Sequence, residues 1–159
     1  MRDRAGLMAV IDATWDELDG FVRGLDETAL LTRVPGLGEG ADTWAVKDVL
    51  THIAAWKRNA AEVARRQADA RTRPVNGFPG QVLGFRTDAF NADLITRTRD
   101  RPAREAVVDH RAAHREALGA LAEVADNRLL SRGRSRLWLT PMIGHPAVHL
   151  VDLRRSFGR

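Results

Sequence analysis

The spacing of the apolar residues limits the fold of this chain more than any other feature. They recur every three or four positions, the period of one face of an α-helix, although less regularly over 81–99. No stretch rich in Val, Ile or Thr stands out with the alternation of a half-buried strand. The chain is therefore predicted to be all-α, with helices over about 3–24, 44–71, 81–99, 100–124 and 140–157.

Glycine, proline and capping residues punctuate these helices. Residues 25–43 contain several glycines and are predicted to form a long loop that packs on a bundle end. A second loop, rich in arginine, is expected over 126–136. The predicted N-caps are Asp42 or Thr43, then Asp100 with Pro102 in the first turn, then Thr140 with Pro141 at the first helical position.

A chain of 159 residues is the size of one domain, so we expect a single unit over 1–159. Long helices joined by loops bury their apolar stripes against one another. The predicted architecture is an antiparallel four-helix bundle with an additional helix on a long crossover. In such bundles metal and substrate sites are built from side chains on facing helices.

The absence of cysteine excludes disulfides, thiolate nucleophiles and thiolate metal sites. Any metal must therefore bind nitrogen or oxygen. The net charge is only +4 despite a pI of about 10.8, because all cations except Lys47 and Lys57 are arginines. No apolar run reaches the roughly 18 residues of a membrane span, and no export segment is evident. We expect a cytoplasmic protein without a membrane partner.

The five histidines are the most informative polar residues. They occur as His52 and as two pairs, His110 with His114 and His145 with His149. Residues four apart lie on one helix face, close enough for both imidazoles to reach one cation. His52 borders the apolar stripe of 44–71 and can supply a third ligand from a neighbouring helix. Three neutral imidazoles suit Zn, Ni, Co or Fe(II), and a satisfied structural histidine cluster is the alternative.

Two motifs resemble the DinB/YfiT-like helical-bundle proteins. Residues 42–56 (DTWAVKDVLTHIAAW) are similar to the family signature W-[ST]-V-[KR]-D-[VL]-[LV]-x-H-[IL]-x-x-W, and residues 143–150 (IGHPAVHL) are similar to the HxxxH of its last helix. The single-domain length, the turn Gly77-Phe78 and the segment Phe90-Asn91-Ala92 match the ClbS/DfsB branch best. The resemblance covers most of the chain but is loose outside the two motifs.

The resemblance implies a metal site made by His52, His145 and His149. Family members that keep these histidines are metal-dependent enzymes, several of which use low-molecular-weight thiols such as mycothiol. It thus implies a hydrolase or thiol transferase acting on an electrophilic small molecule. ClbS/DfsB-like members are instead self-resistance proteins that act on reactive natural products, with no obligatory metal. Because bundles of this type often dimerise, a homodimer is compatible with it.

Pro146 lies between the two predicted ligands of the last helix. If that helix starts at Pro141, Pro146 removes a backbone bond and kinks the helix, so that the pair diverges. If the regular helix begins near His145, Pro146 is tolerated in the first turn and the spacing survives. The sequence leaves both alternatives open.

Several residues near the histidines have two interpretations. Asp48 either holds the His52 tautomer from outside the ligand set or makes an ion pair in the first turns of its helix. Asp152, three residues after His149, has the same ambiguity, and Trp56 either packs in the core or lines a pocket. His114 is predicted to face inward as a buried imidazole bonded to backbone, with a role beside the site as the alternative. His110 is predicted to lie at the boundary or exposed.

Nucleic-acid binding has weaker support. The cations that can neutralise phosphates are the loop residues Arg128, Arg132, Arg134 and Arg136 and, on the second helix, Lys57, Arg58, Arg65, Arg66, Arg71 and Arg73. Acidic residues are nearly as numerous, however, and no recognised nucleic-acid motif is present. Serine hydrolase and phosphate-loop motifs are also absent from the sequence.

Overall fold

The computed structural model describes residues 3–38, 43–130 and 133–158, and every regular element in these ranges is a helix. The all-α fold class is therefore confirmed. In chain order the elements are α1 (Arg4–Arg23), α2 (Glu27–Leu30), α3 (Val46–Ala68), α4 (Pro79–Leu83), α5 (Thr87–Thr98), α6 (Ala103–Ala122), α7 (Asp126–Leu129), the 3-10 helix η2 (Gly133–Met142) and α8 (Gly144–Ser156). None of these helices is long and apolar enough to cross a membrane.

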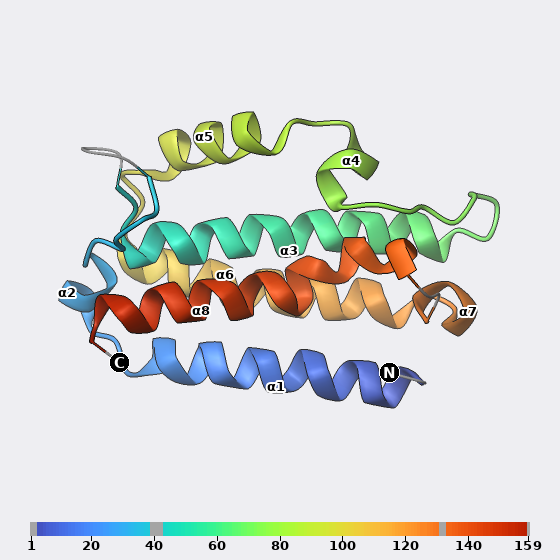
Figure 1. The fold of residues 1–159 in the computed structure, drawn as a ribbon, viewed down its shortest axis with the longest axis horizontal. Coiled ribbons are helices and arrows are strands. Elements are labelled where there is room, and N and C mark those ends of the chain that lie inside the picture. The colour runs from blue at the N-terminus through green and yellow to red at the C-terminus, as the bar shows by residue number, and fades with distance from the viewer. Residues whose placement is uncertain (1–2, 39–42, 131–132, 159) are drawn as a thin grey trace.

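The long helices α1, α3, α6 and α8 form a four-helix bundle, and α4 and α5 lie outside it against α3 (Figure 1). The segment that holds α4 and α5 is the predicted crossover. It returns the chain to the end of the bundle where α3 began, so α3 and α6 run parallel rather than antiparallel. Two ion pairs agree with the parallel direction, since Arg58 contacts Asp109 at 2.7 Å and, further along both helices, Arg65 contacts Glu116 at 2.8 Å.

The apolar core consists of two clusters, one towards each end of the bundle. One includes Leu7, Ile11, Val63, Leu121 and Trp138, and the other includes Leu18, Leu50, Ile53, Val107 and Leu153. Between these clusters the helices carry buried polar side chains, which are His52, Lys57, His110, His114 and His149. A polar layer thus interrupts the core midway along the bundle.

Two predicted segments are divided differently in the structure. The helix expected over 81–99 is broken at Gly84, whose φ of 83° ends α4 in the left-handed region that glycine tolerates best. The loop 25–43 contains α2 and then pairs with the chain before α3, where the Val34 amide donates to the Trp44 carbonyl at 2.8 Å. The described part of this loop, residues 25–38, packs at a bundle end as expected.

The predicted helix starts were less accurate. Ala45 precedes α3, and its amide donates to the Asp48 carboxylate at 2.9 Å, so Thr43 is not the N-cap. Asp42, the alternative cap, lies outside the described residues. The N-cap residue of α6 is Pro102, two positions after the predicted cap Asp100. The loop predicted over 126–136 contains α7 and the start of η2.

The start of α8 resolves the two alternatives for Pro146. Thr140 and Pro141 lie inside η2, so Thr140 does not cap the last helix. Ile143, at φ −127° and ψ −76°, interrupts the helical backbone, and α8 begins at the next residue. Pro146 therefore lies in the first turn of α8, where a missing amide hydrogen costs little.

Candidate functional site

Three imidazoles converge between α3 and α8. Nε2 of His145 lies 2.8 Å from Nε2 of His52 and 3.2 Å from Nε2 of His149. The candidate ligand atoms of all three residues lie within 4.8 Å of one another. Because α8 is regular from its first turn, His145 and His149 project from one face, as their spacing predicts.

This arrangement fits a divalent metal ion. Nitrogens bound to one zinc ion at about 2.0–2.1 Å, at angles between octahedral and tetrahedral, lie about 2.9–3.4 Å apart. The two Nε2 separations of 2.8 and 3.2 Å are close to that range. Three imidazoles with no thiolate or carboxylate among them suit Zn, Ni, Co or Fe(II).

Burial keeps these imidazoles in the neutral form that binds metal. Burial, together with the nearby rings of His145 and His149, lowers the pKa of His52 to about 2. Burial likewise lowers the pKa of His145 to about 3, assisted by the charges of His149 and Lys57. For His149 burial lowers the pKa while the Asp152 carboxylate opposes the shift.

Asp152 is the carboxylate that contacts the cluster. Its Oδ2 lies 3.4 Å from Nδ1 of His149, a contact that is an ion pair only when the imidazole is protonated. Carboxylates in this position orient metal-bound imidazoles and raise their basicity. Within the described ranges, Nδ1 of His52 and Nδ1 of His145 are buried without a hydrogen-bond partner.

Asp48 contacts residues at the start of α3 rather than the His52 imidazole. Besides accepting from the Ala45 amide, its carboxylate lies 3.3 Å from Nζ of Lys47. The ion-pair interpretation of Asp48 therefore agrees with the structure. The i+3 spacing between His149 and Asp152 was the only sequence signal for the carboxylate that does reach the cluster.

Aromatic side chains form one wall of the site. The Trp44 ring lies 5.0 Å from the His52 ring, and the Trp56 ring lies 6.3 Å from His52 and 6.1 Å from His145. Trp56 also donates through Nε1 to Oδ1 of Asn91, at 3.1 Å, which attaches α5 to the wall. Trp56 is thus buried in the core, with its ring near two of the three histidines.

A cavity of about 350 Å³ adjoins this wall between α5 and the segment before α3. Trp44 and Asn91 line it, so it is separated from the histidines by the aromatic wall. Its remaining lining is mixed, comprising Gly38, Asp88, Ala92, Ile95, Thr96 and Arg99. The size and polarity are those of a small-molecule pocket.

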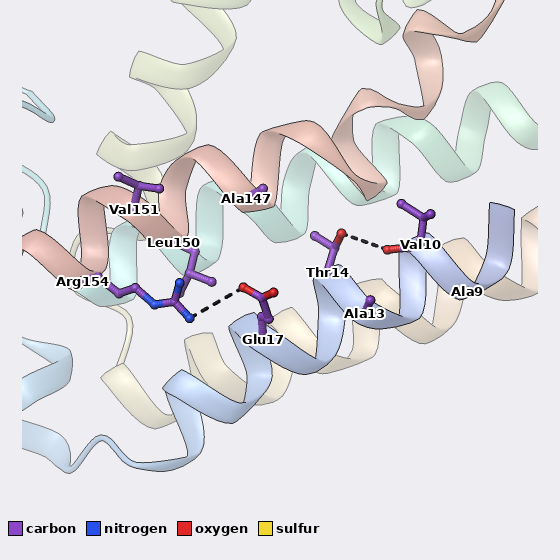
Figure 2. A pocket seen from close by; sticks show the side chains of 9 residues that line it. All are labelled: Ala9, Val10, Ala13, Thr14, Glu17, Ala147, Leu150, Val151 and Arg154. Atoms are coloured by element: carbon purple, nitrogen blue, oxygen red, sulfur yellow. Dashed lines mark hydrogen bonds and ion pairs between the residues drawn. The ribbon is translucent and has the colours of Figure 1, made fainter. Parts of the chain in front are cut away.

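A second cavity, of about 470 Å³, lies in the groove between α1 and α8 (Figure 2). Alanines and valines make most of its floor, and an ion pair of 3.6 Å between Glu17 and Arg154 closes one end. None of the five histidines lines it. The groove is therefore separate from the candidate metal site.

The pair on α6 does not join the three-histidine cluster. His114 Nδ1 lies 3.2 Å from Nζ of Lys57, and its ring stacks on Trp15 at 3.9 Å with an interplanar angle of 4°. The expected backbone bond of His114 is thus replaced by a lysine contact. His110 is 0% exposed, which corrects the prediction that it lies at the boundary.

Several of the cations that suggested nucleic-acid binding have internal partners. Lys57 is buried, and Arg58 and Arg65 pair with the acidic residues of α6. Arg128 donates to the carbonyls of Gln67, Asp69, Ala70 and Thr72, which secures the end of α3. Arg132 lies outside the described residues, as does the side chain of Arg134.

Comparisons with known proteins agree with this architecture. A family model described as the mycothiol maleylpyruvate isomerase N-terminal domain matches residues 11–154. A crystal structure of an uncharacterised protein from Escherichia coli UTI89 superposes with a TM-score of 0.73 at 14% identity, covering 99% of this chain and 94% of that one. At that identity the likeness concerns the fold alone. No curated protein matches the chain.

Proposed function

The chain belongs to the family of the mycothiol maleylpyruvate isomerase N-terminal domain, and from that premise we propose that it is a metal-dependent enzyme acting on an electrophilic small molecule. The convergence of three Nε2 atoms, with separations of 2.8 and 3.2 Å, carries the proposal. His52, His145 and His149 would hold the ion. The reaction would be a thiol transfer or a hydrolysis.

A bound divalent ion supplies Lewis acidity, which lowers the pKa of a thiol or water towards neutrality. The chain contains no cysteine, so a thiol must come from a small cofactor. The family description names mycothiol, and a mycothiol-like thiol is therefore our candidate.

The surrounding residues would orient the ligands and exclude water. Asp152 contacts His149 on the side away from the other imidazoles and would fix its tautomer. Trp44 and Trp56 shield His52 from solvent on the α5 side. The cavity beside Trp44 offers room for a small electrophile or for part of the thiol.

Metal binding is tested on chain purified without a histidine tag and supplemented in turn with Zn, Ni, Co and Fe(II). We expect about one ion per chain by elemental analysis, and loss of that ion in His52→Ala. His110→Ala is the matched control, because it removes a buried histidine of the same polar layer and should retain the ion. Substoichiometric metal under all four conditions contradicts the proposal.

Activity assays separate the reaction types. The loaded protein is incubated with a panel of electrophiles, with and without mycothiol, and the products are identified by mass spectrometry. Turnover only with the thiol supports transfer, and turnover without it supports hydrolysis. If His145→Ala and His149→Ala retained the fold and full protection against a toxic metabolite, a metal-free ClbS/DfsB-like role would replace the proposal.

A further inference from the structure

Lys57 has an unusual environment for a lysine. It lies in the polar layer with 1% of its surface exposed. Its Nζ is 3.2 Å from Nδ1 of His114 and 4.4 Å from the centre of the Trp15 ring. No carboxylate of the described residues lies within ion-pair distance of this amine, although lysines are rarely buried without such a partner.

Lys47, the other lysine of the chain, is a natural comparison on the same helix. It is 8% exposed, lies 3.3 Å from the Asp48 carboxylate and donates to the Arg99 carbonyl. Its ammonium group thus has two oxygen acceptors, a carboxylate with a full negative charge and a carbonyl with a partial one. Among the described residues, the Lys57 amine contacts a neutral imidazole and an aromatic face.

This environment favours the neutral amine of Lys57. Burial lowers the pKa of Lys57 to about 7, and the charge of Asp19 on α1 opposes the shift. An amine with that pKa is neutral in about half of the molecules at pH 7, against about one in 2,500 for an ordinary lysine. The other titratable or charged groups that interact electrostatically with Lys57 or its neighbours are His110, Arg111 and Arg115 of α6 and His145 of α8.

His114 can exchange a proton with Lys57. Burial and the charge of Lys57 lower the pKa of His114 to about 3, so its ring is neutral and Nδ1 can accept from the ammonium group. Trp15 covers the pair on the α1 side. Because the indole is half-buried while Lys57 and His114 are buried, Trp15 forms the outer wall of this cluster.

We propose that Lys57 is a nucleophilic amine that forms an imine with a small aldehyde or ketone, with His114 as its proton acceptor and Trp15 as a cover. The ammonium gives a proton to Nδ1 of His114, and the nitrogen lone pair attacks the carbonyl carbon. The carbon–oxygen π bond breaks, and the oxygen takes a proton from the attacking nitrogen. The imidazolium then protonates that hydroxyl, water leaves, and an iminium of the same total charge remains.

This reaction requires neither metal nor thiol and is independent of the function proposed above. The chain has no cysteine, so amines are its strongest candidate nucleophiles towards carbonyl compounds. Burial of a lysine lowers its pKa and activates the amine for Schiff-base formation, and Lys57 is buried in this way.

The test measures labelling of the full chain with acetaldehyde and sodium cyanoborohydride in the presence of EDTA. Peptide mass spectrometry compares the rate at Lys57 with that at Lys47. At pH 7 we expect Lys57 to react at least about 10-fold faster, with a half-maximal rate near pH 7. Lys57→Arg should show no adduct at position 57 and unchanged labelling of Lys47.

Variants of Trp15, the residue that covers Lys57 and His114, provide a second measurement. Trp15→Ala, or Trp15→Leu if the first loses helical circular dichroism, should raise the Lys57 rate at least about fivefold and leave Lys47 unchanged. Phe21→Ala is the matched control, because Phe21 is a half-buried aromatic residue of the same helix that contacts Phe157 instead. Faster labelling of Lys57 than of Lys47 in either the wild type or the Trp15 variant supports the proposal. Slower labelling in both overturns it.

Discussion

Two histidine pairs with identical spacing behave differently in this bundle. His145 and His149 of α8 point their Nε2 atoms at His52, with separations of 2.8 and 3.2 Å. His110 and His114 of α6 face Lys57 and Trp15 instead. His149, His110 and His114 are buried and His145 is half-buried, so burial alone does not account for the difference.

The residues opposite each pair make the difference. On α8 the partner is a third neutral imidazole, and three lone pairs can be directed at one cation. On α6 the partner is an amine that occupies Nδ1 of His114 and can itself carry positive charge, which opposes a metal ion. Helical spacing places two ligands on a face, but the facing helix decides whether they form a metal site.

The largest expected effect separates the two pairs by metal affinity. His145→Ala should weaken Zn binding by about 1,000-fold, or about 4 kcal/mol, because it removes the imidazole that lies closest to both others. His114→Ala should change the affinity less than about threefold. Competition with a chromophoric chelator measures both. Equal losses in the two variants would show that the pairs are not functionally distinct.

The next effect concerns Lys57 and the pH dependence of stability. The pKa of Lys57 is lowered in the folded state, so the unfolded chain binds more protons between about pH 7 and 10.5, and folding is penalised as pH falls through that window. Lys57→Met should therefore stabilise the fold by about 2–3 kcal/mol more at pH 6 than at pH 9. Denaturant unfolding at the two pH values tests this. Lys47→Met, which leaves Asp48 without its cation, should destabilise the protein instead.

A smaller effect is expected outside the ligand set. Asp152→Asn should lower Zn affinity about 10-fold, or about 1.4 kcal/mol, since it weakens the contact that orients His149. Asp93→Asn is the matched control, because Asp93 makes an exposed ion pair with Arg97 on α5. The same chelator competition applies. An unchanged affinity in Asp152→Asn would remove the assigned orienting role.

The smallest effect tests the unsatisfied histidine of the α6 pair. Neither ring nitrogen of His110 has a partner among the described residues, although the ring is fully buried. His110→Leu has a similar volume and should stabilise the protein by about 1 kcal/mol. Thermal unfolding of this variant is compared with His114→Leu, which leaves the Lys57 amine without an acceptor and should not stabilise. A destabilised His110→Leu would indicate that ordered water satisfies this ring.

Much of the fold and the candidate site follows from local pattern. Apolar periodicity located the long helices, and the i, i+4 spacing placed His145 and His149 on one face of α8. The motif around His52 identified the third imidazole through family resemblance. These features depend on residues close in sequence, so a single helix turn or motif determines them.

Other features depend on contacts between distant segments. Asp48 and Asp152 each lie three or four residues from a histidine of the cluster. Because α3 starts at Val46, the Asp48 carboxylate accepts from the Ala45 amide at the helix start, whereas Asp152 contacts His149. His110 was expected at the boundary because the apolar stripe of its own helix carries no information about neighbouring helices. In the structure α1 places Trp15 over the His110 ring. The break at Gly84 was missed because an isolated glycine is tolerated within helical patterns.

The sequence by itself determined an all-helical chain without thiols, with histidines at spacings that allow a metal site. It also determined that Lys47 and Lys57 are the only lysines. The tertiary structure decided which histidines converge, that Pro146 lies in a harmless first turn, and that Lys57 is buried beside His114. The physical reason is that spacing fixes directions within one helix, whereas coordination, desolvation and pKa depend on what the neighbouring helices place opposite.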